Sequence, residues 1–378
     1  MIGYFDKYVS NTIAGSGNQF FFTQPEEQIN VGRIFYKITV GGEYDYSLLF
    51  SNIIDSTFSD GKISRRNFIL PSWKIIRASL GKCKYIPDNI NFSNVKSGTK
   101  GEAGSFDIVV EDLKAITFGG NKEKNVNPGE LFNSDPLRLS YEKGEYLVLE
   151  IAFSGKQIPN HEESIIPSFL LTNSGWKLSK KMPFPSMIGI NRDVSGKVVF
   201  LGDSITQGIG TPMNKYSHWN AHLVSMLDSD YAYWNLGLGF ARADDAASDG
   251  VLLYKAKQND IAVVCFGVND ILQGFTSEQI KTSLFKIVNE LKERGIRIIL
   301  QTVPPFDYDE YKRIIWEDVN NYIQTELVKY VDTVFDVVSV LCVSEDKRHF
   351  AQYGGHPNSE GCRKWAEALY PILDNFIK

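Results

Sequence analysis

The chain has 378 residues, more than a single hydrophobic core usually organises, so two domains are expected. Apolar residues make up 43% and charged residues 22% of the sequence, which is typical of a soluble globular protein. The formal net charge of −5, with no basic stripe along the sequence, argues against nucleic acid as a partner.

The amino-terminal residues show no apolar core followed by a small-residue cleavage site, so nothing marks the chain for export. The longest apolar runs, such as residues 261–266, have the length of a strand and are far too short to span a membrane. We therefore expect a cytoplasmic protein that has no membrane partner. The sequence leaves a homo-oligomer open. The four cysteines show no Cys-x-x-Cys spacing and are expected to be free thiols.

Residues 1–190 consist of short runs rich in β-branched and aromatic residues, separated by clusters of glycine, asparagine and serine. Several runs alternate apolar with polar residues, which is typical of half-buried antiparallel strands. The pattern predicts an all-β sandwich of the jelly-roll kind. Prolines and lysines at 180–186 indicate the join to the next domain. The clearest predicted strands are 19–23, 34–40, 106–110 and 146–153.

Residues 191–378 have a different pattern, in which predicted strands alternate with longer predicted helices. Five such units predict an α/β domain with a parallel sheet covered by helices on both faces. Ligands of such sheets bind at the carboxyl ends of the strands, where the strand order reverses. The predicted strands are 198–201, 231–236, 261–266, 296–303 and 331–337, and the predicted helices are 214–227, 243–257, 277–294, 309–329 and 359–377.

A serine, Ser204, lies on a tight turn between the first of these strands and the start of a helix. Gly202 gives the turn its backbone freedom, and a serine at a helix start meets converging N–H groups and a favourable dipole. This position favours a nucleophile. The alternative is an ordinary serine that caps the helix.

Two further strand ends and one loop offer partners for this serine. Gly237 follows the second strand, Asn269 follows the third, and His356 lies just before the last helix. Acyl transfer requires a hydroxyl nucleophile, a base, and donors that face the oxygen that becomes negative. We expect Ser204 to attack and His356 to accept its proton. The expected oxyanion donors are the Ser204 N–H, the Gly237 N–H and the Asn269 side-chain amide, with the glycine also letting substrate approach the backbone.

The four blocks at Ser204, Gly237, Asn269 and His356 resemble, in their order and placement, the SGNH or GDSL-type hydrolase family, over about residues 195–378. The resemblance implies a flavodoxin-like three-layer fold and the hydrolysis of esters, often of short acyl groups on sugars or lipids. A β domain ahead of such a domain is similar to the layout of some bacterial carbohydrate esterases.

One residue departs from the family pattern. The family usually places an aspartate three residues before the histidine, and here that residue is Tyr353. In a serine protease, disabling the aspartate lowers turnover by about 10⁴, because the imidazole takes the wrong tautomer. We expect a backbone carbonyl to accept a hydrogen bond from His356 Nδ1 instead, which gives a Ser–His dyad. The alternatives are that Glu345 or Asp346 takes this role, or that the site has lost catalysis and only binds.

The acidic residues beside the motifs, Asp203 and Asp270, are predicted to hold their turns by local hydrogen bonds rather than to transfer protons, and Asn235 is interpreted in the same way. His218 and His222 have the spacing of a metal pair on one helix face, but no third ligand is evident, so no metal is expected.

Several other residues have a structural interpretation. The segment from Gly237 to Arg242 only partly matches a dinucleotide fingerprint, so no cofactor is expected. Arg242 is expected to have a structural role rather than to contact substrate hydroxyls. The indole side chains are expected to pack in the core rather than to line a sugar subsite; they are Trp219, Trp234 and Trp316. His161 and His349 are expected to lie on the surface.

The resulting hypothesis is a serine esterase that removes short acyl groups, with acetyl as the leading choice, from a carbohydrate or another small molecule. Two alternatives stay open. One is a lysophospholipase or thioesterase, although no long apolar lid segment is apparent in the sequence. The other is a carbohydrate-binding relative with impaired catalysis, for which Tyr353 is the motive.

Overall fold

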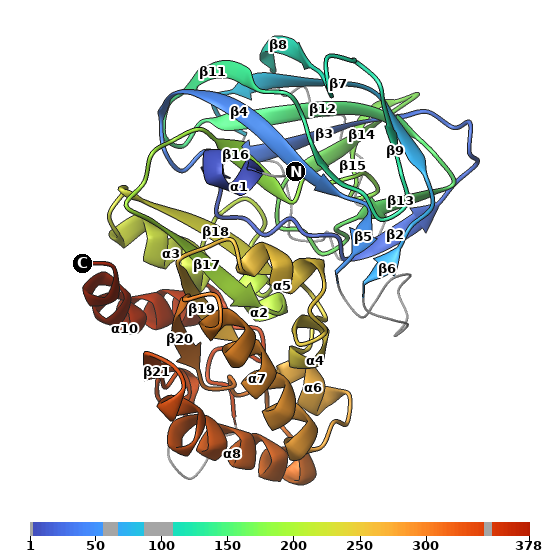
Figure 1. The fold of residues 1–378 in the computed structure, drawn as a ribbon. Coiled ribbons are helices and arrows are strands. Elements are labelled where there is room, and N and C mark those ends of the chain that lie inside the picture. Colours follow the sequence, from blue (N-terminus) through green and yellow to red (C-terminus); the bar gives the residue numbers. More distant parts are fainter. Residues whose placement is uncertain (1–2, 56–66, 87–108, 344–349) are drawn as a thin grey trace. The chain divides into compact units, whose positions relative to one another are not determined.

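A computed structural model describes residues 3–55, 67–86, 109–343 and 350–378 (Figure 1). The chain divides into two compact units. The first comprises Met1–Ile54 and Phe58–Asp193, and the second comprises Asp55–Thr57 and Val194–Lys378. Within the described ranges, none of the helices combines the length and the apolar character needed to cross a membrane.

The first unit is built from antiparallel strands, as predicted (Figure 1). One sheet has the order β1-β16-β4-β10, with β11 also paired to β4, and a larger sheet has the order β15-β14-β3-β12-β7-β8, with β9 also paired to β7. The jelly-roll connectivity stays a prediction. The strands of the smaller sheet are β1 (Val9–Ser10), β4 (Gly42–Ser51), β10 (Leu131–Asn133), β11 (Leu137–Tyr141) and β16 (Met187–Ile190).

The strands of the larger sheet are β3 (Asn30–Lys37), β7 (Trp73–Cys83), β8 (Glu111–Ile116), β9 (Lys124–Val126), β12 (Tyr146–Ser154), β14 (Ser168–Thr172) and β15 (Gly175–Leu178). The short pairs are β2 (Phe20–Thr23) with β13 (Gln157–Asn160), and β5 (Ile53–Ile54) with β6 (Phe68–Ile69); a single turn of helix, α1 (Tyr4–Lys7), precedes them. Most of the predicted strand 106–110 lies outside the described residues, and β8 begins directly after it.

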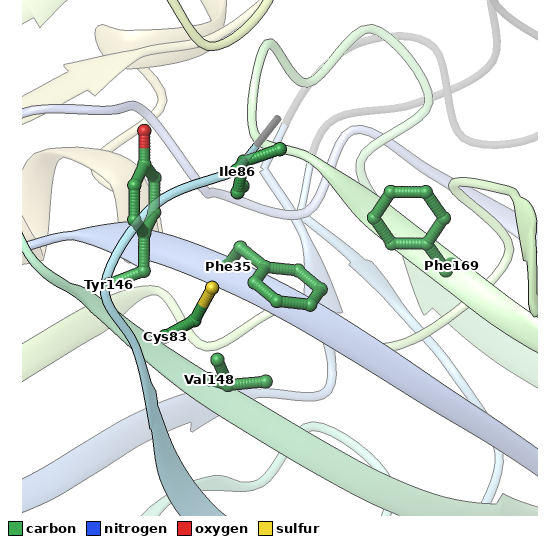
Figure 2. Close-up of a cluster of buried hydrophobic side chains, with 6 residues drawn as sticks. All are labelled: Phe35, Cys83, Ile86, Tyr146, Val148 and Phe169. Carbon is green, nitrogen blue, oxygen red and sulfur yellow. The ribbon is translucent and has the colours of Figure 1, made fainter. Parts of the chain in front are cut away.

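One face of the larger sheet carries a compact apolar cluster (Figure 2). Phe35 on β3 lies directly opposite Val148 on β12, and Tyr146 lies opposite Cys83 on β7. Because these residues alternate along their strands, their side chains reach the same side of the sheet, where Phe169 from β14 meets Phe35 edge to face. In β12 the intervening residues Leu147 and Leu149 are buried as well, so this strand is covered on both faces.

The second unit has the predicted α/β architecture, with a five-stranded parallel sheet of order β18-β17-β19-β20-β21. This is the flavodoxin-like order, which reverses direction beside β17 and so opens a crevice at the carboxyl ends of the strands. On one side of the sheet α3 packs against α10, and on the other α7 packs against α4 and α8 (Figure 1). The strands are β17 (Gly196–Gly202), β18 (Tyr231–Gly237), β19 (Ile261–Cys265), β20 (Arg297–Gln301) and β21 (Thr333–Phe335).

Two predicted helices are interrupted or shortened by residues with left-handed backbone. The helix expected at 214–227 begins only at α3 (Trp219–Met226), because Asn214 and Tyr216 have φ of 65° and 50°. The helix expected at 243–257 is divided into α4 (Ala243–Ala246) and α5 (Val251–Ala256), since Asp249 has φ of 56°.

The three remaining long helices follow the predictions closely, as α7 (Ser277–Lys292), α8 (Glu310–Thr325) and α10 (Ser359–Ile377). The side chain of Asn358 accepts a hydrogen bond from the Gly361 N–H at 3.0 Å and so fixes the start of α10. This cap also fixes the loop that precedes it. Short elements complete the unit: α2 (Ser204–Gln207), α6 (Val268–Leu272), the 3-10 turn η1 (Leu327–Lys329) and α9 (Val338–Leu341).

Candidate active site

Ser204 is the first residue of α2, just beyond the carboxyl end of β17, which lies between β18 and β19 in the sheet. Asp203 caps this helix, since its side chain accepts a hydrogen bond from the Ile205 N–H at 2.9 Å. Ser204 keeps 7% of its surface exposed. The turn therefore holds a nearly buried hydroxyl at the edge of the sheet where ligands of such folds bind.

The loop before α10 brings His356 to this hydroxyl, although 152 positions separate the two residues. The Ser204 Oγ lies 2.8 Å from His356 Nε2. When the proton of the imidazole is on Nδ1, Nε2 can accept the hydroxyl proton of the serine. The two loops thus meet at hydrogen-bond distance, which is the geometry that a nucleophile and its base require.

The surroundings of His356 favour its neutral form. Burial lowers the pKa of His356 below its ordinary value of 6.5, and no charged group in the described residues contributes to this shift. The ring of Phe306 meets the imidazole edge to face, with 5.3 Å between centroids and 80° between planes. An imidazole that stays neutral near pH 7 is able to act as a base.

Tyr353 does not take the place of the missing aspartate. Its side chain packs on the first turn of α10, where a Cβ atom on Gly361 would lie 2.5 Å from the Tyr353 Cβ, and the Lys364 ammonium lies 5.2 Å from the ring centroid. Among the described residues, no backbone carbonyl or side chain accepts a hydrogen bond from His356 Nδ1. The expected carbonyl partner is therefore absent from this part of the chain. Glu345 and Asp346 lie outside the described residues.

Gly237 ends β18 beside α2, and its environment differs from the expectation. Its N–H donates a hydrogen bond to Asn235 Oδ1 at 2.8 Å. A Cβ atom here would lie 2.1 Å from the backbone nitrogen of Gln207. The expectation that this glycine lets substrate approach is wrong, because the backbone of α2 fills that space. Its role as an oxyanion donor stays a prediction, and in this structure its N–H is already in use.

Asn269 is the second residue of α6, which begins directly after Gly267. Its Nδ2 donates a hydrogen bond to the carbonyl oxygen of Ala241 at 3.0 Å. A side-chain amide has two N–H groups, so one is left for a ligand while the other holds the loop after β18.

A buried polar network that the sequence did not predict joins α2 to β18. The Thr206 carbonyl accepts from Asn220 Nδ2 at 2.8 Å and from Asn235 Nδ2 at 3.1 Å. Gln207 Oε1 accepts from the Gly239 N–H at 2.6 Å. Of these residues the sequence analysis had assigned a turn-holding role only to Asn235, whose bond to the Gly237 N–H agrees with it. Asn220 gave no signal in the sequence, since it lies within an otherwise unremarkable helix.

Two buried carboxyl groups support the turns of the site. Burial raises the pKa of Asp203 and that of Asp270 to about 7. Asp270 accepts hydrogen bonds from the N–H groups of Ala243 at 2.9 Å and Asp244 at 3.3 Å, and so caps the start of α4. The hydrogen bond of Asp203 is local, as predicted, whereas Asp270 on α6 reaches across to the start of α4, 26 and 27 positions away.

Arg242 and the indole side chains that were candidates for binding are in structural positions. The Arg242 guanidinium lies 3.2 Å from Asp245 Oδ1 and stacks over Phe275. Trp219, Trp234 and Trp316 are buried. Each of these residues contributes to packing in this structure.

The remaining histidines form no metal site in the described part of the chain. No group of three His, Cys, Asp or Glu side chains there could hold an ion, His218 and His222 included. His161 is buried, so the expectation of a surface histidine is wrong for it. His349 lies outside the described residues.

Comparison with known proteins gives one family. Residues 200–364 match the family described as GDSL-like Lipase/Acylhydrolase. No curated protein matches this sequence.

Solved structures with some likeness include a family two carbohydrate esterase from Cellvibrio japonicus, 11% identical over 98% of this chain and 97% of that one, with a TM-score of 0.39. A carbohydrate esterase family 3 from Talaromyces cellulolyticus is 19% identical over 48% of this chain and 97% of that one, with a TM-score of 0.35. A member of the lipolytic protein G-D-S-L family from Veillonella parvula is 18% identical over 47% and 97%, with a TM-score of 0.39. Such low TM-scores support no conclusion about this chain.

Proposed function

Since residues 200–364 form a GDSL-like lipase/acylhydrolase domain, we propose that the protein is a serine esterase with Ser204 as nucleophile and His356 as base. The observation that supports this proposal best is the 2.8 Å distance between Ser204 Oγ and His356 Nε2. A serine hydroxyl is a weak nucleophile unless an adjacent base accepts its proton. An imidazole kept neutral by burial is suited to that task.

The proposed reaction has two halves. Ser204 Oγ attacks the ester carbonyl while His356 Nε2 accepts the hydroxyl proton. The tetrahedral intermediate collapses, the C–O bond to the alcohol breaks, and His356 returns the proton to the leaving alkoxide. Water then attacks the acyl-enzyme with His356 again as base, which releases the carboxylic acid and restores the serine.

The proposed oxyanion donors are the Ser204 N–H and the second N–H of the Asn269 amide. Gly237 is the third donor expected from the sequence, and its N–H would first have to leave Asn235 Oδ1. Loss of one oxyanion donor typically raises the barrier by about 2.7 to 4 kcal/mol. Asn269→Ala should therefore lower kcat by about 10²- to 10³-fold.

For the substrate, we propose a short acyl ester, acetyl first, with a carbohydrate as the alcohol portion. The carbohydrate portion rests on the layout expected from the sequence, a β unit ahead of the hydrolase domain. A panel of acetylated oligosaccharides, p-nitrophenyl esters of increasing acyl length, and lysophospholipids tests it. Preference for long acyl chains or lysophospholipids would favour the lysophospholipase or thioesterase alternative.

Hydrolysis of p-nitrophenyl acetate by the full chain tests the proposed chemistry. Ser204→Ala should lower kcat at least about 10³-fold while thermal unfolding stays close to that of the parent. Ser225→Ala is the matched control, because it removes an exposed hydroxyl from α3 and should leave kcat unchanged. Retention of most activity by Ser204→Ala would exclude Ser204 from the mechanism.

A second candidate function is a binding protein with an impaired catalytic site, and Tyr353 in place of a carboxylate is the observation that favours it. Rapid mixing with an activated ester separates the two functions. An active esterase whose deacylation is the slower step gives a burst of p-nitrophenol close to the enzyme concentration, and one whose acylation is slower gives steady release; Ser204→Ala abolishes either. A binding protein gives no serine-dependent release of p-nitrophenol, yet still binds acetylated oligosaccharides.

A further inference from the structure

The orientation of His356 needs an explanation. The Ser204 hydroxyl contacts only Nε2, and no described residue accepts a hydrogen bond from Nδ1. The imidazole plane turns about the Cβ–Cγ bond, and a single hydrogen bond at Nε2, which lies close to that axis, restricts this rotation only weakly. Another contact must therefore hold the ring plane.

Phe306 makes that contact. Its ring meets the imidazole edge to face at 5.3 Å, which is within the preferred range for aromatic pairs. The same ring packs on the backbone next to the histidine, since a Cβ atom on Gly355 would lie 3.0 Å from two of its ring carbons. Phe306 therefore touches both the histidine ring and the chain that carries it.

The segment that carries Phe306 is itself held at both ends. Before it, the Val303 carbonyl accepts from Trp316 Nε1 at 2.7 Å, and the Val303 N–H donates to Asn320 Oδ1 at 2.7 Å. After it, Asp307 Oδ1 accepts from the N–H of Ala351 at 2.7 Å. The last bond ties this segment to the loop that leads to His356. Two prolines, Pro304 and Pro305, restrict the backbone between these points.

We propose that Phe306 is a positioning residue for His356, which fixes the imidazole plane through aromatic packing where the family usually uses a carboxylate. The inference rests on the proposed function, because it assigns Phe306 to the base of that reaction. Phe306 lies outside the four sequence motifs of the site, so its role is additional to theirs. Phe306 removes water from one side of the ring, which agrees with the lowered pKa of His356 and its origin in burial.

The first test replaces Phe306 and follows p-nitrophenyl acetate hydrolysis from about pH 5 to pH 9. Phe306→Ala should lower kcat by about 10- to 100-fold with little change in KM, because a misplaced base costs rate rather than binding. The acid limb of kcat/KM should move up toward 6.5, the ordinary value for an imidazole, because the ring gains water. Phe306→Tyr keeps an aromatic ring and should restore most of kcat.

Two controls separate this role from a structural one. Phe285→Ala removes another partly exposed ring, which contacts Tyr330 edge to face at 5.2 Å on the far helix α7, and should leave kcat and the pH profile unchanged. If Phe306→Ala does not fold, Phe306→Leu fills most of the volume without an aromatic edge and replaces it in the same comparison.

The outcomes distinguish the two proposals. If Ser204→Ala abolishes hydrolysis but Phe306→Ala keeps the parental kcat and acid limb, the inference about Phe306 is wrong and the esterase proposal stands. If Ser204→Ala stays active, the esterase proposal fails. An NMR titration of the His356 ring needs no substrate and still tests the contact. If the pKa of His356 in Phe306→Ala equals that of the parent, the proposed role of Phe306 is wrong.

Discussion

Gly237 shows how a single hydrogen atom in place of a methyl group can be required by the packing of a site. The Cβ of an alanine here would lie 2.1 Å from the Gln207 nitrogen and 2.4 Å from the Thr206 carbonyl carbon. Both are backbone atoms of α2, so no side chain can move aside to relieve the clash. The close approach of β18 to α2 therefore depends on this glycine.

We expect Gly237→Ala to lower the free energy of unfolding by about 3 kcal/mol or more, because α2 and β18 must separate. Chemical denaturation measures this. Gly274→Ala is the control: it has open space around its Cβ position but a φ of 84°, so it should cost only roughly 1 kcal/mol. Equal losses in the two variants would mean that the contact with α2 is not decisive.

At the scale of single residues, the sequence predicted which residues of the site lie together, but not which atoms surround each of them. Ser204 and His356 lie together as the resemblance implied, because the order of the motifs reflects the order of the strand ends. Gly237 was misread, since a residue type reveals backbone freedom and not which atoms lie opposite. Phe306 received no role in the sequence analysis, because edge-to-face packing leaves no periodic pattern in the sequence.

The elements of the second unit were predictable where burial alone determines them. The strands β17, β18 and β19 are continuous apolar runs, which is typical of a parallel sheet covered on both faces. Interruptions such as the left-handed Asp249 between α4 and α5 were missed, because its residue type tolerates helix and turn alike. A helix start at Ser204 was expected, but the limits of α2 were not, and α6 was not predicted, since helices this short show no hydrophobic period.

The contact between α2 and β18 depends on asparagine side chains, which suggests a comparison of two variants. Asn235→Leu should lower the free energy of unfolding by about 3 kcal/mol, because it leaves the Gly237 N–H and part of the Thr206 carbonyl unsatisfied in a buried place. It should also lower kcat strongly, since the turn after β18 loses its anchor. Denaturation and ester hydrolysis measure the two effects.

Asn220→Leu is the matched variant for this test. It removes a hydrogen bond to the same Thr206 carbonyl and leaves the bond between Asn235 and Gly237 in place. A similar loss of stability with a much smaller loss of kcat is expected. If both variants lose kcat in proportion to their stability, the asparagine network stabilises the fold without positioning the site.

On the scale of the whole molecule, three buried titratable groups contribute to the pH dependence of stability with opposite signs. In the second unit, burial raises the pKa of Asp203 and Asp270 from 3.8 to about 7. Between these values the folded protein keeps protons that the unfolded chain has lost, so the free energy of unfolding falls as pH rises from about 4 to 7. The stabilising contribution of the two aspartates is fully present only below 3.8, their ordinary pKa in the unfolded chain.

Lys180, in the first unit, contributes to the pH dependence of stability with the opposite sign. Burial lowers the pKa of Lys180 from 10.5 to about 7. Between these values the unfolded chain holds a proton that the folded protein does not, so the free energy of unfolding rises as pH rises from about 7 to 10.5. Stability is therefore expected to pass through a minimum near pH 7, where the contribution of the two aspartates is largely lost and that of Lys180 has not yet appeared.

Thermal unfolding of two variants at about pH 5, pH 7 and pH 9 tests this profile. Asp270→Asn keeps one oxygen acceptor, which can serve the Ala243 N–H, and loses the acceptor for the Asp244 N–H. Because the amide cannot ionise, the fall in Tm between pH 5 and pH 7 should shrink. Lys180→Met keeps an unbranched side chain without the amine, so it should remove much of the rise above pH 7 and raise Tm at pH 7 itself. Glu310→Gln, which neutralises an exposed carboxylate, is the control. Slopes that match the parent in both buried variants would show that other groups determine the pH dependence, because each variant removes one titration and leaves the rest.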